Sequence, residues 1–173
     1  MGELIATYFL KSGIGWAVFG AGAGLMLGCA GSARGIRIAA GQAAGVMSEK
    51  PELFGKLLVL MALPGTQGFY GVIWTVMIAL RAGLFAGKVV MPPLVGISIL
   101  FLGIAVGGAL LKSAVFQGET SAACINLTAR RPDQSGRSIL MPALVETYAL
   151  LAMVFGVVLL IFMTPEGGLS FGE

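Results

Sequence analysis

Four long stretches of the sequence carry almost no charge, and they constrain the fold more than any other feature. Residues 12–33, 57–80 and 89–111 contain no Asp, Glu, Lys or Arg, and residues 138–165 contain only Glu146. Each stretch reaches the roughly 20 residues that an α-helix needs to cross a hydrocarbon core about 30 Å thick. Strands of a membrane barrel would alternate over much shorter segments. The sequence therefore predicts an all-α integral membrane protein with four transmembrane helices in the lipid bilayer.

The composition excludes several other classes of protein. Hydrophobic residues make up 57% of the 173 residues and charged residues only 11%, whereas a soluble domain has about 25% charged residues. The absence of His, with only Cys29 and Cys124 as thiols, excludes a zinc ribbon, a disulfide scaffold and a catalytic centre built on His. The basic residues are spread along the chain, so nucleic acid is not an expected partner. We expect no enzymatic activity within the chain and no organic cofactor, because the sequence shows neither a nucleophile–base pair nor a phosphate-binding loop.

Two short polar turns, each with a proline, join the spans in pairs at residues 47–52 and 128–135. Eight of the 11 basic residues lie toward these turns, and three lie toward the other side. The eight are Arg34, Arg37, Lys50, Lys56, Lys112, Arg130, Arg131 and Arg137, and the three are Lys11, Arg81 and Lys88. By the positive-inside rule, we expect both hairpin turns in the cytoplasm and both termini outside. We expect the multi-pass chain to lie in the plasma membrane.

The sequence repeats itself without a gap when residue numbers are shifted by 81, as from Pro51 to Pro132. Because this shift passes over two helices, it preserves the orientation of the copies. We therefore expect two tandem helical hairpins, one in residues 1–88 and the other, with a short C-terminal tail, in residues 89–173. Further pairs that carry the repeat are Gly55 with Gly136, Ala62 with Ala143, Leu63 with Leu144, and Thr66 with Thr147.

The one acidic residue within a predicted span is the main candidate for chemistry. Glu146 lies near the middle of the fourth span, and Gly65 takes its place in the first copy of the repeat. A carboxylate at this depth costs on the order of 3 kcal/mol or more, so it indicates a function. Only the second hairpin carries this group.

Polar residues in two other spans lie at positions from which they can reach Glu146. Thr66, Gln67 and Tyr70 have spacings that put them on one helix face. Gln117 and Glu146 lie at nearly equal distances along the chain from the turn at 131–132, so two antiparallel helices place them at equal depth. Amide oxygens, a hydroxyl and a single carboxylate suit one small monovalent cation or a proton.

Prolines are expected to disturb both outer spans. Pro64 and Pro142 each lack an N–H donor and disturb the carbonyl four residues earlier, which bends the helix locally and frees an acceptor. For Pro64, that carbonyl belongs to Leu60.

The segments LPGTQGFYG (63–71) and LVETYALL (144–151), together with the duplicated hairpin, resemble the proteolipid, or K (c-type), subunit of V-type and A-type rotary ATPases. The resemblance is to the bacterial form with four helices and one carboxylate per chain, and it covers residues 13–163. It implies a ring of identical subunits with odd-numbered helices inside and even-numbered helices outside. It also implies a stator membrane subunit with an essential Arg, the central-stalk subunits and a soluble head that hydrolyses or synthesises ATP.

The resemblance also implies a sodium site. In sodium-binding members, a leucine carbonyl, a threonine, two glutamines and the glutamate bind the ion, and a tyrosine bonds to the carboxylate. By motif position, the residues here are Leu63, Thr66, Gln67, Gln117, Glu146 and Tyr70. The role of the Leu63 carbonyl rests on the resemblance alone, since the proline argument points to Leu60.

The sequence leaves two alternatives to a sodium-carrying rotor. A proton needs only Glu146, because an apolar site favours the neutral, protonated carboxyl. Sodium needs several oxygens to replace its hydration shell, and the two glutamines have no evident use in a proton site. We therefore expect Na⁺. A small secondary transporter with an intramembrane Glu is the other alternative, although repeats in such proteins are commonly inverted.

Overall fold

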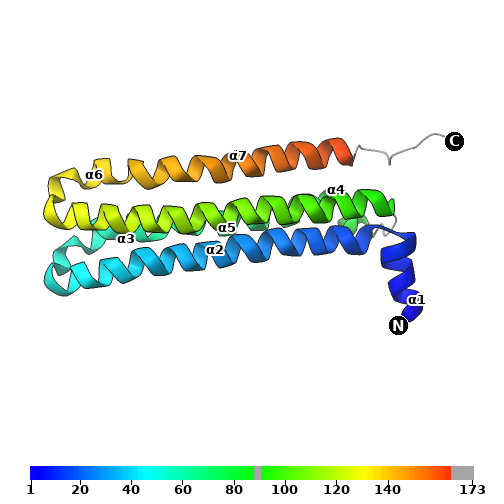
Figure 1. Ribbon diagram of the computed structural model, residues 1–173, viewed down its shortest axis with the longest axis horizontal. Helices are drawn as coiled ribbons and strands as arrows, with labels where there is room; N and C mark the ends of the chain where they lie inside the picture. The colour runs from blue at the N-terminus through cyan, green and yellow to red at the C-terminus, as the bar shows by residue number, and fades with distance from the viewer. Residues whose placement is uncertain (88–90, 165–173) are drawn as a thin grey trace.

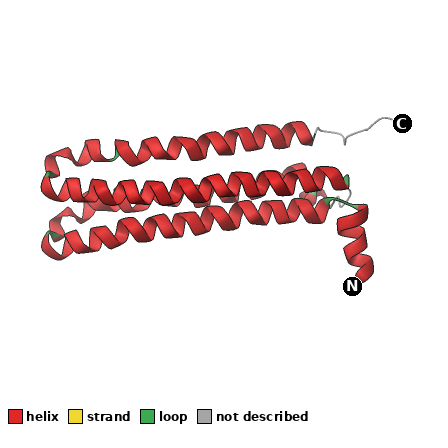
Figure 2. Ribbon diagram, viewed as in Figure 1, coloured by secondary structure: helices red, strands yellow, loops and turns green. Residues whose placement is uncertain are grey.

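A computed structural model describes residues 1–87 and 91–164, nearly all of them helical (Figure 2). Four helical spans run side by side along the long axis of the bundle (Figure 1). All four are long and apolar enough to cross a membrane, which confirms the predicted all-α, four-span architecture. The spans are Ile14–Glu49, Pro51–Arg81, Pro93–Arg130 and Pro132–Met163.

The first and third spans are single helices, and the second and fourth are interrupted. The uninterrupted helices are α2 (Ile14–Glu49) and α5 (Pro93–Arg130). The second span consists of η2 (Pro51–Leu53), α3 (Phe54–Ala62), η3 (Leu63–Gly65) and α4 (Thr66–Arg81). The fourth consists of η5 (Pro132–Gln134), α6 (Ser135–Ser138) and α7 (Leu140–Met163). The remaining elements are α1 (Gly2–Ile5) and the π-helix η1 (Ala6–Lys11), which turn away from the bundle (Figure 1), and η4 (Leu84–Ala86).

The helices continue beyond the charge-free runs that predicted them. The runs end at residues 33 and 111, but α2 and α5 contain 36 and 38 residues, or about 54 and 57 Å at 1.5 Å per residue. A charged residue ends an apolar run, but Arg, Lys and Ala are good helix formers and do not end the hydrogen-bonded helix. The boundary at residues 88–89 and the tail after residue 164 lie outside the described residues.

Helices α2 and α5 pack against each other through glycines. A Cβ on Gly20 would lie 2.5 Å from the carbonyl oxygen of Ile99, and a Cβ on Gly107 would lie 2.9 Å from the Cα of Gly24. Only glycine allows backbones to approach this closely, and such contacts are a common basis of helix association in membranes. The facing pairs, each separated by 83 in residue number, are Gly13 with Gly96, Gly20 with Gly103, Gly24 with Gly107, and Gly35 with Gly118.

The expected disturbance of the helix is found near the proline of the second and of the fourth span. Pro64 lies within the 3-10 turn η3, which separates α3 from α4. The fourth span is interrupted at Ile139, between α6 and α7. Pro142 has no N–H to donate to the carbonyl of Ser138, the residue at which α6 ends.

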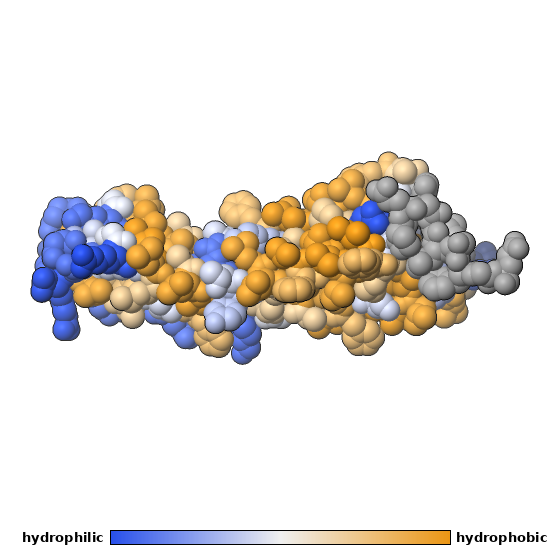
Figure 3. All heavy atoms as spheres, turned by 90° about the horizontal axis from the view of Figure 1, so that it is seen from above, coloured by the Kyte–Doolittle hydropathy of each residue, from blue (hydrophilic) through white to orange (hydrophobic). Residues whose placement is uncertain are grey.

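The two hairpin turns lie at one end of the bundle, opposite the N-terminus and the end of α7 (Figure 1). Hydrogen bonds hold the turns together, because the ammonium of Lys50 donates to the carbonyl of Ala129 at 2.7 Å and that of Lys56 donates to Pro132 at 3.2 Å. This end is hydrophilic, and the adjoining surface is largely apolar (Figure 3).

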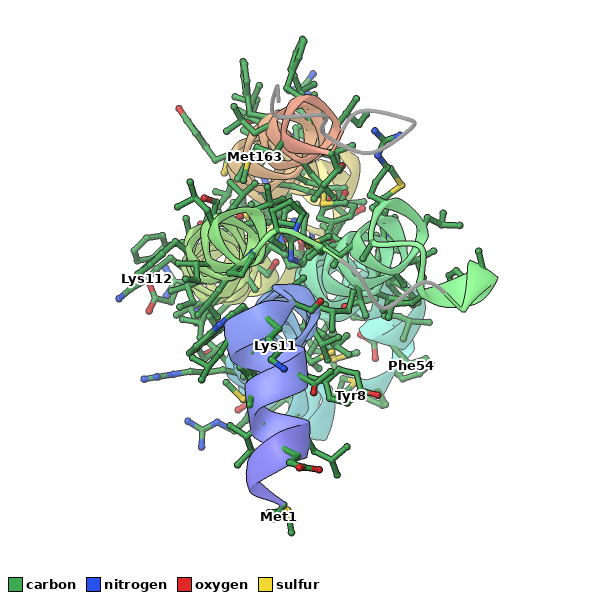
Figure 4. The ribbon with its side chains drawn as sticks, turned by 90° about the vertical axis from the view of Figure 1, so that its right-hand side faces the viewer. Met1, Tyr8, Lys11, Phe54, Lys112 and Met163 are labelled. Atoms are coloured by element: carbon green, nitrogen blue, oxygen red, sulfur yellow. The ribbon has the colours of Figure 1, made fainter. Side chains whose placement is uncertain are left out.

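Helix α2 packs against α5 and α4, and α7 packs against α5. Seen along the bundle, Lys112 on α5 points away from the other helices (Figure 4).

Candidate ion-binding site

The carboxylate of Glu146 lies half-buried on α7 and accepts hydrogen bonds from two other helices. The hydroxyl of Tyr70, on α4, donates to Oε1 at 2.7 Å, and Nε2 of Gln117, on α5, donates to Oε2 at 3.3 Å. The expected equal depth of Gln117 and Glu146 is therefore found, with α5 and α7 antiparallel on either side of the turn at Arg131. Two donors aimed at separate oxygens orient the carboxylate within the bundle.

Two glutamines form the inner part of the site. Gln67 on α4 and Gln117 on α5 are both fully buried, and Nε2 of Gln67 donates to Oε1 of Gln117 at 2.6 Å. A buried amide without a partner costs about 1–3 kcal/mol. Each glutamine here has a partner on another helix, so the pair joins α4 to α5 and α5 to α7.

The beginning of α4 supplies a hydroxyl and a backbone oxygen. The hydroxyl of Thr66 donates to the carbonyl of Leu63 at 3.1 Å and lies 3.4 Å from Oε1 of Gln67. Because η3 interrupts the span at Leu63–Gly65, Leu63 lies where the regular α-helical hydrogen bonding changes. The structure thus brings together all six residues singled out in the sequence: Leu63, Thr66, Gln67, Tyr70, Gln117 and Glu146.

Two serines that sequence reasoning missed support this cluster. The hydroxyl of Ser113 on α5 lies 3.5 Å from Nε2 of Gln67 and donates to the carbonyl of Val145 at 3.2 Å. The hydroxyl of Ser32 on α2 accepts from the backbone N–H of Gly68 at 2.8 Å. Ser32 and Ser113 occupy equivalent positions in the repeat, which was the available signal. Both are buried and tie α2 and α5 to the backbone beside the site.

The possible cation ligands in this cluster are mostly oxygen atoms, and together they carry one negative charge. Within the described residues, there is no group of three or more His, Cys, Asp or Glu that could hold a metal. The two side chains that hydrogen-bond to Glu146, Tyr70 and Gln117, are neutral. Rotating the terminal amide of Gln117 by half a turn would present its oxygen, instead of its nitrogen, to a cation beside the carboxylate. Such a set suits a monovalent cation, because one ion neutralises the one charge and the neutral oxygens replace its water.

The residues at the repeat-equivalent positions do not form a second site of this kind. In the repeat, Gly65 stands in place of Glu146, Ile36 in place of Gln117 and Tyr148 in place of Gln67. Tyr148 is 71% exposed, whereas Gln67 is fully buried. The described part of the chain therefore has one such cluster for its two hairpins.

Comparison with known proteins bears on the repeat. The family described as the C subunit of ATP synthase matches this chain twice, at residues 19–78 and 100–159. The shift between the starts of the two matches is that of the repeat, which confirms its offset. Both matches have the same direction along the chain, which supports a duplicated hairpin over the inverted repeats common in secondary transporters.

Two curated relatives are similar over most of the chain. The V-type sodium ATPase subunit K of Enterococcus hirae is 34% identical over 131 residues, which are 76% of this chain and 81% of the relative. The A-type ATP synthase subunit K of Methanocaldococcus jannaschii is 34% identical over 161 residues, which are 92% of this chain and 70% of the relative. The chain belongs to the family of the ATP synthase C subunit and is a rotor proteolipid, a membrane-embedded and non-catalytic ion-translocating subunit of a V-type or A-type ATPase.

Proposed function

We propose that this rotor proteolipid transports Na⁺, which binds at Glu146 during rotation. The proposed ligands are the Glu146 carboxylate, the side-chain oxygens of Gln67, Gln117 and Thr66, and the carbonyl of Leu63. Tyr70 would hold the carboxylate without binding the ion. The observation that carries the proposal is the hydrogen-bonded chain through two fully buried glutamines to a single carboxylate.

Sodium explains why the site contains so many neutral oxygens. An ion that leaves water must exchange its hydration shell for protein oxygens. A proton would need Glu146 and a partner for the protonated carboxyl, which Tyr70 or Gln117 alone could provide. The second, fully buried glutamine would then have no function in proton binding, although burying its amide costs free energy. One of the two relatives is named a sodium ATPase subunit, which supports the same ion.

We infer that identical copies form a closed ring with α2 and α5 inside and the interrupted spans outside. The glycine contacts between α2 and α5 support a tightly packed inner wall. A stator membrane subunit with an essential Arg and the central-stalk subunits would be the other partners. We place the hairpin turns in the cytoplasm and both termini outside, because eight of 11 basic residues lie toward the turns.

Competition between Na⁺ and a carbodiimide tests the ion. The reagent takes up the proton of a protonated carboxyl, whose oxygen then adds to the carbodiimide carbon, whereas a bound cation keeps the carboxylate ionised and without that proton. Rings in detergent are treated at fixed pH and constant ionic strength, with NaCl replacing choline chloride. Millimolar Na⁺ is expected to slow modification of Glu146, identified by peptide mass.

Two variants control this experiment. Glu146→Gln is expected to remove both the modification and its sodium dependence, whereas Glu119→Gln, at an exposed position on α5, leaves both unchanged. Modification that follows pH alone and ignores Na⁺ would show that the ring carries H⁺, with the glutamines holding the protonated carboxyl.

A further inference from the structure

An apolar groove lies on the first half of α2, away from the ion site. It has a volume of about 650 Å³ and is lined by Trp16, Val18, Phe19, Gly22, Ala23, Met26 and Leu100. Gly22 forms its open floor, since a Cβ added there would meet nothing within 4 Å. Phe19 and Met26 beside it are 60% and 64% exposed. Within the described residues, no side chain fills the space above Gly22.

The repeat identifies a side chain that fits this groove. Gly20 on α2 is buried against α5, and its equivalent in the second hairpin is Phe101 on α5, which is 66% exposed. Positions 20 and 101 are thus equivalent in the repeat. Gly20 faces the other hairpin of its own chain, whereas Phe101 points away from the chain. In a ring of tandem repeats, the outward face of α5 meets α2 of the next copy, as α2 meets α5 within one chain.

The surroundings of Gly20 predict what Phe101 would contact. A Cβ on Gly20 would touch Ile99 and Leu100, and a Cβ on Gly103 would touch Gly20. The neighbours of Gly20 are therefore Ile99, Leu100 and Gly103. Their repeat equivalents, in the same order, are Val18, Phe19 and Gly22, which all line the groove. The repeat and the shape of the surface therefore lead independently to the same place.

We propose that Phe101 of one copy inserts into the groove over Gly22 on α2 of the neighbouring copy. This inference rests on the ring put forward above and specifies how adjacent subunits meet. Within one chain, glycine faces glycine and the backbones touch. Between chains, an aromatic ring faces glycine and holds the two helices farther apart, so close and wide spacings alternate around the inner wall.

A second aromatic position follows the same rule. Trp74 on α4 is fully buried, where its ring covers Gly24 of α2. Its equivalent on α7, Phe155, is 64% exposed. By contrast, Phe69 on α4 and its equivalent Leu150 on α7 are exposed by 71% and 43%. A position exposed in both hairpins faces lipid in this arrangement, so Phe69 provides a matched control.

Mixed cross-linking tests the contact directly. Two chains are co-expressed without native thiols (Cys29→Ser, Cys124→Ser), one with Gly22→Cys and the other with Phe101→Cys. A disulfide, or a bridge made by a short bifunctional thiol reagent, is expected only when both chains are present. Phe69→Cys paired with Gly22→Cys is expected to give no bridge. An assembled mixed ring that forms no bridge between the two introduced thiols overturns the contact.

Ring stability gives a second, independent readout. Phe101→Ala is expected to lower the temperature of ring dissociation by several degrees, whereas Phe69→Ala leaves it unchanged. Gly22→Leu fills the groove and is expected to weaken the ring similarly, with less than additive loss in combination with Phe101→Ala. Unchanged ring stability in both single variants, with a bound lipid lost from Gly22→Leu in native mass spectra, would assign the groove to an acyl chain. Wild-type protein that forms no oligomer would instead overturn the ring itself.

Discussion

The hydroxyl of Tyr70 donates a hydrogen bond of 2.7 Å to Oε1 of Glu146 and so joins α4 to α7 across the boundary between the two hairpins. The two residues are 76 positions apart in the sequence. Gln117 contacts the other oxygen of the same carboxylate. Three helices thus hold one acidic group. Each carboxylate oxygen accepts one hydrogen bond and keeps a lone pair for an ion.

Removing the Tyr70 hydroxyl should weaken the site without removing any proposed ligand. A hydrogen bond to a charged group contributes about 1.5–3 kcal/mol, so Tyr70→Phe is expected to reduce Na⁺ affinity by about tenfold or more. The measurement is the Na⁺ concentration that halves carbodiimide modification of Glu146. Tyr148→Phe is the control, because Tyr148 is 71% exposed and lies outside the cluster. Equal Na⁺ affinity in the two variants would contradict a role for the Tyr70–Glu146 bond.

Replacing Gln117 should separate sodium binding from protonation. Gln117→Leu removes a proposed oxygen ligand and takes from Nε2 of Gln67 its 2.6 Å hydrogen bond, which leaves only the 3.5 Å contact with Ser113, at a cost of about 1–3 kcal/mol. We expect Na⁺ protection to weaken by at least about tenfold, while modification of Glu146 at low pH persists. An unchanged response to Na⁺ would remove Gln117 from the set of ligands.

The α2–α5 interface should not accept even one methyl group at Gly103. A Cβ there would collide with the backbone of Gly20, so Gly103→Ala is expected to destabilise the chain by about 1–3 kcal/mol or more. Gly108, in the same helix, has nothing within 4 Å of an added Cβ. Gly108→Ala is therefore expected to be neutral or to stabilise the helix by up to about 1 kcal/mol. Thermal unfolding in one detergent measures both, and the reverse order of stabilities would contradict this packing.

The proposed sidedness is tested with single cysteines in a Cys29→Ser, Cys124→Ser background. Asp133→Cys in the turn η5 is expected to react with a membrane-impermeant maleimide only after the cells are permeabilised. Ala86→Cys in η4, at the other end of the bundle, is expected to react in intact cells. Both positions are exposed in the folded chain. The opposite pattern of labelling would invert the topology.

The sequence predicted the spans well because a charge is costly in hydrocarbon, and the predicted turns contain the ends of α2 and α5, although the charge-free runs are shorter than these helices. The cost of charge in lipid limits the apolar run at Arg34, whereas the helix continues to Glu49 because Arg, Ala and Gln sustain its hydrogen bonds. The site was predictable for a similar reason. Helical spacing puts Thr66, Gln67 and Tyr70 together, and a tight turn makes Gln117 level with Glu146.

The sequence by itself determined the four spans, the tandem repeat and the candidate residues of the site, because these depend on composition, period and distance from a turn. Only the tertiary structure decided how the helices align: equivalent residues are 81 apart, whereas the glycines that touch are 83 apart. The repeat defines which residues are equivalent along the chain. The connections between the helices determine how far one helix is displaced along the other when the two pack. This alignment of the helices buries Gly20 and exposes Phe101. It also brings Ser32 and Ser113 to the site.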